Sequence, residues 1–143
     1  MIYLKELKIT YHRKRVQDDF ISKRAKSPEQ IYKLFKWMSH ETREKALCLH
    51  LNPQLEIISY EQVGMGDAMG LTLDIQGIFR GALLSMATSI VLIHNHPHGC
   101  RKPSEKDTAA FEHLKLIGEL HKIKLQDFII ISEEGYFSFE EEI

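Results

Sequence analysis

The pattern of hydrophobic and polar residues along this chain of 143 residues predicts a series of short strands. The stretch from Ser89 to Ile93 is continuously apolar and rich in β-branched residues, which is typical of a buried strand. The first stretch, from Ile2 to Tyr11, mixes apolar and charged side chains with partial alternation, as an edge strand does. The predicted strands cover residues 2–11, 45–52, 55–62, 71–74, 89–93, 127–132 and 136–140.

Three other stretches have the spacing of helices. Ser27 to Gln30 reads as a capping box with Pro28 at the first helical position, and apolar residues then recur at helical spacing to about Ser39. Further helices are predicted over residues 75–87 and 104–122, with a glycine-bearing loop through Gly64, Gly66 and Gly70. We expect Trp37 to pack in the core. Hairpin-like strands interleaved with helices predict an α/β fold with a mixed β-sheet flanked by helices.

Length and composition predict a single domain over residues 1–143, in which 1–26 form a basic strand and connector and 27–143 the helix and core. Cys48 and Cys100 do not have the spacing of a small secreted protein, and no leader is evident, so we expect a reducing, cytoplasmic environment. No apolar run approaches the roughly 18 residues of a membrane span, so no membrane association is expected.

The residues that follow the apolar strand at 89–93 suggest a metal site. With a side-chain period of two, His94 and His96 leave one face of the strand and Asn95 the other. Ser104 and Asp107 lie at the predicted start of a helix. Two imidazoles and a carboxylate suit Zn²⁺ and leave its fourth position open for a water whose pKa falls to about 7. Asp107 could instead serve only the helix terminus, but the joint spacing favours the metal.

This spacing resembles that of the RadC-like proteins within the JAMM, or MPN-type, metallopeptidases. The resemblance is carried by His94-Asn95-His96-Pro97-His98-Gly99, Pro103-Ser104-Glu105-Lys106-Asp107, Ser27-Pro28, Glu44 before 47–52, Gly64, Gly66, Ala82 and Tyr136-Phe137-Ser138-Phe139. It implies an α-β-α sandwich of the cytidine-deaminase-like kind and one zinc per chain, held by His94, His96 and Asp107. It also implies that Ser104 hydrogen-bonds near the tetrahedral intermediate and that a peptide or isopeptide bond is cleaved.

Such a hydrolysis needs a general base, and glutamate is the usual choice. Glu44, just before the strand at 45–52, is our candidate, and the spacing leaves Glu41, Glu56 and Glu61 open. The chain departs from the RadC-like pattern at Gln76-Gly77, where Arg-Glu is common, and at His98, where a small polar residue is usual. His98 and Cys100 are therefore candidate substrate or loop contacts, and a Cys100 thiolate could bind zinc in a resting state.

The charge is unevenly distributed and leaves a second function open. Residues 1–26 hold eight Lys and Arg against three Asp and Glu, whereas the rest holds eleven against seventeen. Arg13-Lys14-Arg15 could touch phosphates, although a charged edge strand guarded against aggregation explains them as well. The first hypothesis is a zinc metallopeptidase acting on a peptide, isopeptide or small conjugate. The alternatives are a catalytically weak RadC-like accessory protein that binds DNA, and a scaffold that binds a protein partner.

Overall fold

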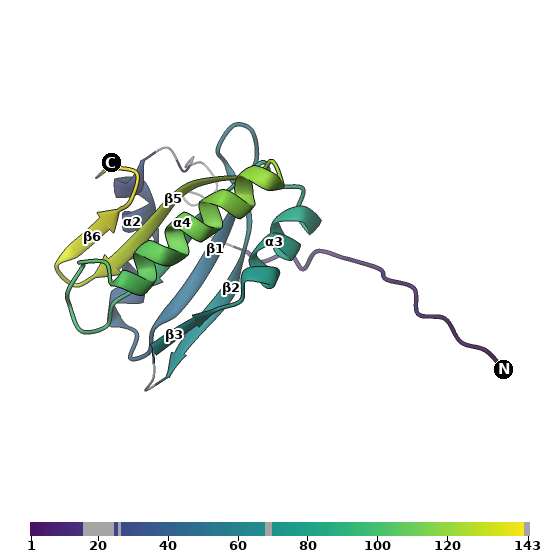
Figure 1. The fold of residues 1–143 in the computed structure, drawn as a ribbon, viewed down its shortest axis with the longest axis horizontal. Helices are drawn as coiled ribbons and strands as arrows, with labels where there is room; N and C mark the ends of the chain where they lie inside the picture. The colour runs from purple at the N-terminus through teal and green to yellow at the C-terminus, as the bar shows by residue number, and fades with distance from the viewer. Residues whose placement is uncertain (16–24, 26, 68–69, 142–143) are drawn as a thin grey trace.

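The centre of the protein is a six-stranded sheet with the strand order β3-β2-β1-β4-β5-β6 (Figure 1). The computed structural model describes residues 1–15, 25, 27–67 and 70–141. The strands are β1 (Lys45–Leu51), β2 (Ile57–Asp67), β3 (Gly70–Leu73), β4 (Ser89–Asn95), β5 (Lys124–Ser132) and β6 (Gly135–Ser138). Only β4 and β5 pair in parallel, and the other neighbours are antiparallel. The predicted mixed α/β fold is therefore confirmed.

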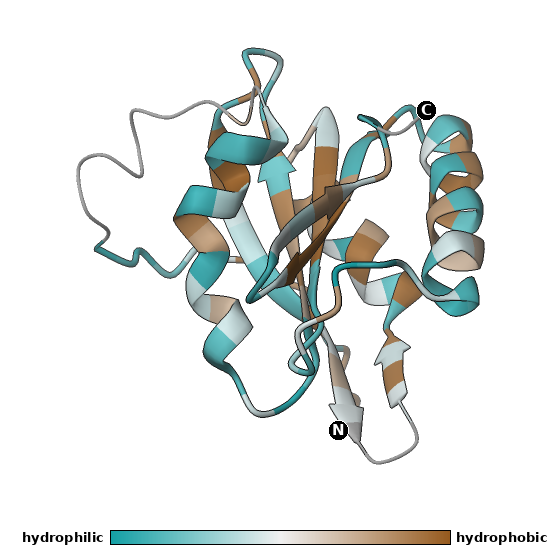
Figure 2. Cartoon of the chain, turned by 90° about the vertical axis from the view of Figure 1, so that its left-hand side faces the viewer, coloured by the Kyte–Doolittle hydropathy of each residue, from teal (hydrophilic) through white to brown (hydrophobic). Residues whose placement is uncertain are grey.

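Helices cover both faces of this sheet. They are α2 (Pro28–Phe35), continued by the 3₁₀ helix η1 (Lys36–His40), α3 (Ile75–Leu84) and α4 (Glu105–Leu120). Ile31, Phe35 and Met38 pack with Leu47 and other strand residues on one face. The residues of α3 and α4 that face the sheet pack on the other face, in a cluster that includes Ile78, Phe79, Phe111 and Leu114. Figure 2 shows hydrophobic residues concentrated in the strands between the helices.

Strand β4 explains why the apolar run at 89–93 is continuous. Ile90 and Leu92 pack toward α3 and α4, whereas Val91 and Ile93 pack toward α2. All seven residues of the strand are buried. A strand that is covered on both faces needs apolar residues at successive positions, because neither side meets water.

The predicted glycine loop at residues 64–70 is wrong, because Gly64 and Gly66 belong to β2. A Cβ at Gly64 would stand 2.9 Å from the carbonyl oxygen of Thr72 in β3, and one at Gly66 would stand 2.8 Å from the Cβ of Glu44. Because they have no side chain, Gly64 and Gly66 allow β3 and Glu44 to approach β2 closely. The helix expected to run to about Ser39 also changes type, since the α-helix ends at Phe35 and a 3₁₀ helix follows.

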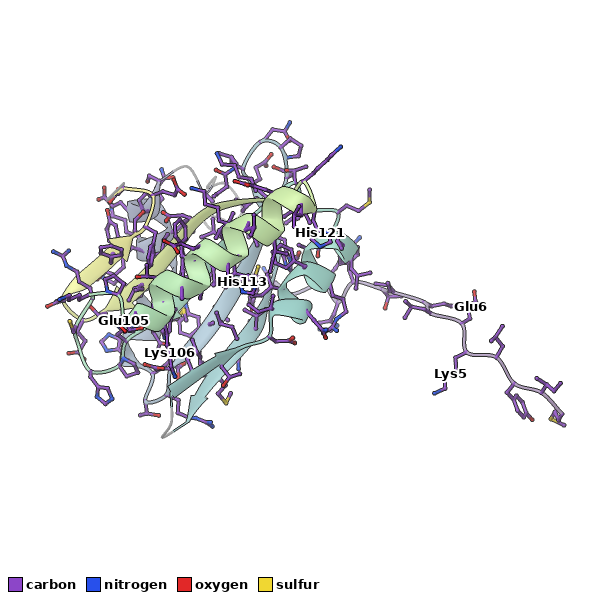
Figure 3. All side chains as sticks on the ribbon, viewed as in Figure 1. Lys5, Glu6, Glu105, Lys106, His113 and His121 are labelled. Atoms are coloured by element: carbon purple, nitrogen blue, oxygen red, sulfur yellow. The ribbon has the colours of Figure 1, made fainter. Side chains whose placement is uncertain are left out.

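The predicted edge strand at residues 2–11 is wrong as well. Residues 1–15 form neither helix nor strand, are exposed, and extend away from the rest of the protein as an arm (Figure 1). Figure 3 shows Lys5 and Glu6 on this arm, far from the sheet. Where the arm meets the rest of the protein, the Tyr11 hydroxyl donates to the carbonyl of Leu84 in α3. Alternation predicts which side chains share a face, but a strand also needs a neighbour to pair with. Most of the predicted connector, residues 16–24 and 26, lies outside the described residues.

Two further expectations concern single features. Trp37 is 49% exposed, so the prediction that it packs in the core is wrong. It lies on η1, where Met38 and Ser39 are the buried residues. Within the described part of the chain, no helix has both the length and the apolar character that crossing a membrane requires.

His50 in β1 should make stability depend on pH. It is buried, its Nδ1 lies 2.7 Å from the Ser59 hydroxyl, and burial lowers its pKa from 6.5 to about 4. Between these values the unfolded chain binds a proton that the folded chain does not, so stability falls as pH decreases from 6.5 to 4. We expect His50→Gln to flatten the decrease in urea midpoint over this range. Replacing the exposed His113 by Gln should leave the decrease as in wild type, and an equal slope in His50→Gln would contradict the assignment.

Candidate metal centre

Glu44, His94 and His96 form a cluster in which one ligand atom from each residue lies within 4.8 Å of the others. The pairing of β1 with β4 brings them together, although Glu44 is distant in sequence from the histidines. These strands are antiparallel, with Ala46 opposite His94. The residues just before β1 therefore lie beside the residues that end β4. Among the glutamates left open by the sequence, Glu44 is the one in this cluster, while Glu41 pairs instead with Lys45 at 3.2 Å.

Asp107 adds a second carboxylate from the start of α4. Ser104 and Asp107 form a complete capping box, in which the Ser104 hydroxyl accepts from the Asp107 amide and the Ser104 amide donates to Asp107 Oδ2 at 2.8 Å. The same carboxylate places Oδ1 3.1 Å from His94 Nδ1 and Oδ2 3.2 Å from His96 Nε2. Asp107 thus caps the helix and at the same time faces both imidazoles, although it lies outside the group of Glu44, His94 and His96 whose ligand atoms are within 4.8 Å of one another.

The hydrogen bonds of the two histidines determine which nitrogens are available to a cation. His96 Nδ1 lies 2.8 Å from the Cys100 carbonyl oxygen, which only accepts, so Nδ1 donates and the neutral ring keeps its lone pair on Nε2. When His94 donates from Nδ1 to Asp107, its lone pair likewise lies on Nε2. That Nε2 is buried, has no hydrogen-bond partner among the described residues, and lies 3.8 Å from Glu44 Oε2.

The hydrogen bonds between Asp107 and the imidazoles shift the pKa values of Asp107 and His96. Burial alone would raise the pKa of Asp107, but hydrogen bonds from His94 and His96 outweigh burial and hold the pKa well below its usual value. Burial would lower the pKa of His96, yet in the protonated ring Nε2 donates to Asp107 and Nδ1 to the Cys100 carbonyl, and these bonds raise the pKa above the ordinary value. A cation at Nε2 would take the place of that proton. The imidazoles of His94 and His96 with the Glu44 carboxylate form a donor set suited to a divalent cation, and the Asp107 carboxylate lies against both rings. A cation would satisfy the Nε2 of His94, which has no hydrogen-bond partner among the described residues. The residues present therefore fit a metal ion.

Asn95 and Gly66 hold Glu44 in place, and sequence reasoning missed both roles. The fully buried Asn95 amide accepts from the Lys45 N–H at 2.6 Å and donates to the carbonyls of Met38 and Arg43, at 2.9 and 3.1 Å. From the other side, the Gly66 N–H donates to the Glu44 carbonyl at 2.7 Å. The signal for Asn95 was available, since a polar residue amid an apolar buried strand needs partners.

The cluster opens into a pocket of about 660 Å³. Its other lining includes the candidate residues His98, Cys100 and Ser104. Between β3 and α4 the walls are largely apolar, with Leu71, Leu73, Ile75, Ala109 and Ala110, and Lys106 and His113 also line the pocket. Figure 3 shows Lys106 near the N-terminal end of α4 and His113 further along it. Gln76 and Gly77, where the sequence departs from the RadC-like pattern, are not part of this lining.

The protein is thus an α/β protein with a sheet between helices and with a candidate metal centre formed where β4 ends beside the start of β1. A family model described as "RadC-like JAB domain" matches residues 25–143. The chain belongs to this family, as the resemblance implied.

Several proteins named UPF0758 are similar in sequence to this chain. The chain is 32% identical to the UPF0758 protein of Thermotoga maritima over 122 residues, which cover 85% of this chain and 55% of the relative. The UPF0758 protein of Streptococcus gordonii is 32% identical over 87% of this chain and 56% of its own length. The UPF0758 protein of Methanosarcina acetivorans is 32% identical over 81% of this chain and 51% of its own length. The chain therefore spans about half the length of these relatives.

Proposed function

We propose that this protein is a metal-dependent hydrolase that cleaves amide bonds of the peptide or isopeptide type, with Zn²⁺ as the metal. The observation that carries the proposal is the buried Nε2 of His94, which has no hydrogen-bond partner in the described part of the chain and faces Glu44, near His96 and Asp107, in the lining of an open pocket. A buried polar atom without a partner is costly, so its retention at the base of a pocket favours a function.

We assign His94, His96 and Asp107 as the metal ligands and Glu44 as the general base. The Asp107 carboxylate lies against both imidazoles, whereas Glu44 is 30% exposed and lines the pocket, where substrate would lie. When bound, the ion would lower the pKa of a water molecule and polarise the scissile carbonyl. Glu44 would take the proton from that water and deliver it to the leaving amine. The Ser104 hydroxyl accepts from the Asp107 amide, so its own hydrogen remains available to donate to the developing oxyanion.

The shape of the pocket supports an extended substrate. β3 is the last strand of the sheet on this side, so no described strand pairs with its outer edge, and its residues Leu71 and Leu73 form an apolar wall of the pocket. A peptide or isopeptide-linked tail could add to this edge through main-chain hydrogen bonds and lead its scissile bond to the histidines. A small conjugate would occupy only the inner part.

The test compares hydrolysis with metal content. Purified protein is assayed on fluorogenic peptide and isopeptide substrates, with and without added zinc, beside Glu44→Gln. We expect metal-dependent hydrolysis in wild type, and in Glu44→Gln a loss of 10²-fold or more, a typical contribution of general base catalysis. Elemental analysis should still find about one zinc per chain in this variant. Loss of zinc from Glu44→Gln would make Glu44 a ligand, and full activity without zinc would overturn the proposal.

A further inference from the structure

A second pocket lies on the α2 face of the sheet. Its volume is about 360 Å³, within the range of small-molecule sites. It is lined by Lys14, Phe35, Trp37, Lys45, Tyr60 and Gln62, among others. These residues come from the N-terminal arm, the continuous helical segment α2–η1, β1 and β2, so four separate segments form the pocket.

Two aromatic rings in this pocket remain open to solvent. Trp37 is 49% exposed and Tyr60 is 37% exposed. On this face the buried cluster comprises residues of α2, η1, β1, β4 and β5, whereas Tyr60 on β2 is not part of it. Neighbouring aromatic surface left exposed beside a cavity is typical of a binding site rather than of a core.

Cationic groups accompany the rings. Lys14 Nζ donates to the Tyr60 hydroxyl at 2.8 Å and stands 5.5 Å from the centre of its ring. Lys45 forms an ion pair with Glu41 at 3.2 Å, which leaves Lys14 as the lining cation without a carboxylate partner among the described residues. Arg13 and Arg15 flank Lys14 in the sequence and are exposed. The pocket therefore combines flat aromatic surface with positive charge at its edge.

We propose that this pocket binds a nucleotide unit, with its base stacked on Trp37 and its phosphate near Lys14. Every base has a flat π face that stacks on aromatic side chains, and phosphate is attracted by lysine. The Gln62 amide supplies hydrogen-bonding groups at the same place. The unit could come from a free mononucleotide or from single-stranded nucleic acid, since both present the same base and phosphate.

This inference stands apart from the hydrolase proposal. Glu44 and Lys45 are consecutive, but Glu44 lines the metal pocket and Lys45 lines the nucleotide pocket. The two pockets lie on opposite faces of the sheet, because Leu47 in the nucleotide pocket belongs to the core cluster under α2, whereas Leu73 and Ala110 in the metal pocket pack against the cluster under α3 and α4. Binding at one can therefore be measured with the other disabled, for example in Glu44→Gln.

Trp37 provides a direct readout, since it is the only tryptophan in the chain. Its fluorescence is followed during titration with a short oligothymidylate, with thymidine monophosphate, and with a blunt duplex of equal length. We expect quenching by the oligothymidylate or the mononucleotide and little by the duplex, whose bases are already stacked. If thymidine monophosphate and the oligothymidylate quench at equal concentration, a free nucleotide is sufficient for binding. If only the oligothymidylate quenches, the pocket binds single-stranded nucleic acid. No quenching by either ligand, or equal quenching by the duplex, would overturn the proposal.

Variants then locate the site, with labelled ligand followed by fluorescence anisotropy. Trp37→Ala should weaken binding by about tenfold or more, because loss of the stacking contact with one base typically costs about 1–3 kcal/mol. Lys14→Gln should weaken binding and lower the slope of affinity against salt by about one. Lys124→Gln, an exposed lysine at the start of β5, is the control and should bind as wild type. Equal weakening in all three variants, or in none, would contradict the site.

Discussion

His96→Ala is expected to abolish zinc binding. The Nδ1 of His96 donates to the Cys100 carbonyl, which leaves Nε2 directed toward Asp107 and the metal site. Removal of an outer partner alone typically costs 10- to 100-fold in metal affinity, and loss of a ligand should cost at least about 100-fold. The measurement is zinc affinity by competition with a chromophoric chelator.

Thermal unfolding offers a second readout that does not depend on activity. An ion at 100 times its Kd stabilises the folded state by about 2.7 kcal/mol, so zinc should raise the Tm of wild type by several degrees. His96→Ala should show no such rise. His113→Ala is the matched control, since His113 lines the same pocket from α4 but lies outside the cluster. A wild-type protein without a zinc-dependent rise, or a His96→Ala variant that keeps the full rise, would refute the metal site.

Asn95→Ala is expected to lower both stability and activity. Its amide makes three hydrogen bonds, to the Lys45 N–H and to the carbonyls of Met38 and Arg43. At about 1 kcal/mol for each bond, and more where a buried partner is left unsatisfied, the free energy of unfolding should fall by about 3 kcal/mol or more. Urea denaturation measures this loss.

The effect on activity separates positioning from metal binding. Without Asn95 the segment that carries Glu44 loses its attachment to β4, so kcat should fall while zinc is still bound by the histidines. Ser89→Ala is the control on the same strand, because the Ser89 hydroxyl is buried but has no hydrogen-bond partner among the described residues. Its removal should be close to neutral. If Asn95→Ala unfolds at the same urea concentration as Ser89→Ala, the amide does not hold this segment.

The local part of the site could be predicted because its residues are close in sequence. The alternation of β4 determines the common face of His94 and His96, and the capping box determines where Asp107 lies on α4. The RadC-like resemblance and the mixed α/β fold are likewise confirmed. Periods of two and 3.6 residues are local properties, so one sequence is enough to recognise them.

The remaining features depend on pairing between distant segments, which periodicity does not report. Glu44 could only be placed as one of several glutamates until the antiparallel register of β1 and β4 put it beside the histidines. The extension of β2 through Gly64 and Gly66 depends on the approach of β3 and Glu44. The arm has the alternation of a strand, yet residues 1–15 pair with no strand among the described residues.

The capping box of α4 also governs motion at the metal centre. The carboxylate of Asp107 accepts from the Ser104 amide and faces both histidines, so the first turn of the helix cannot fray without withdrawing this carboxylate from the histidines. Helix ends are normally the first parts of a fold to open. With Asp107 as a metal ligand, as proposed, opening of this one helical turn would release the ion, so the lifetime of the complex should depend on how often the turn opens.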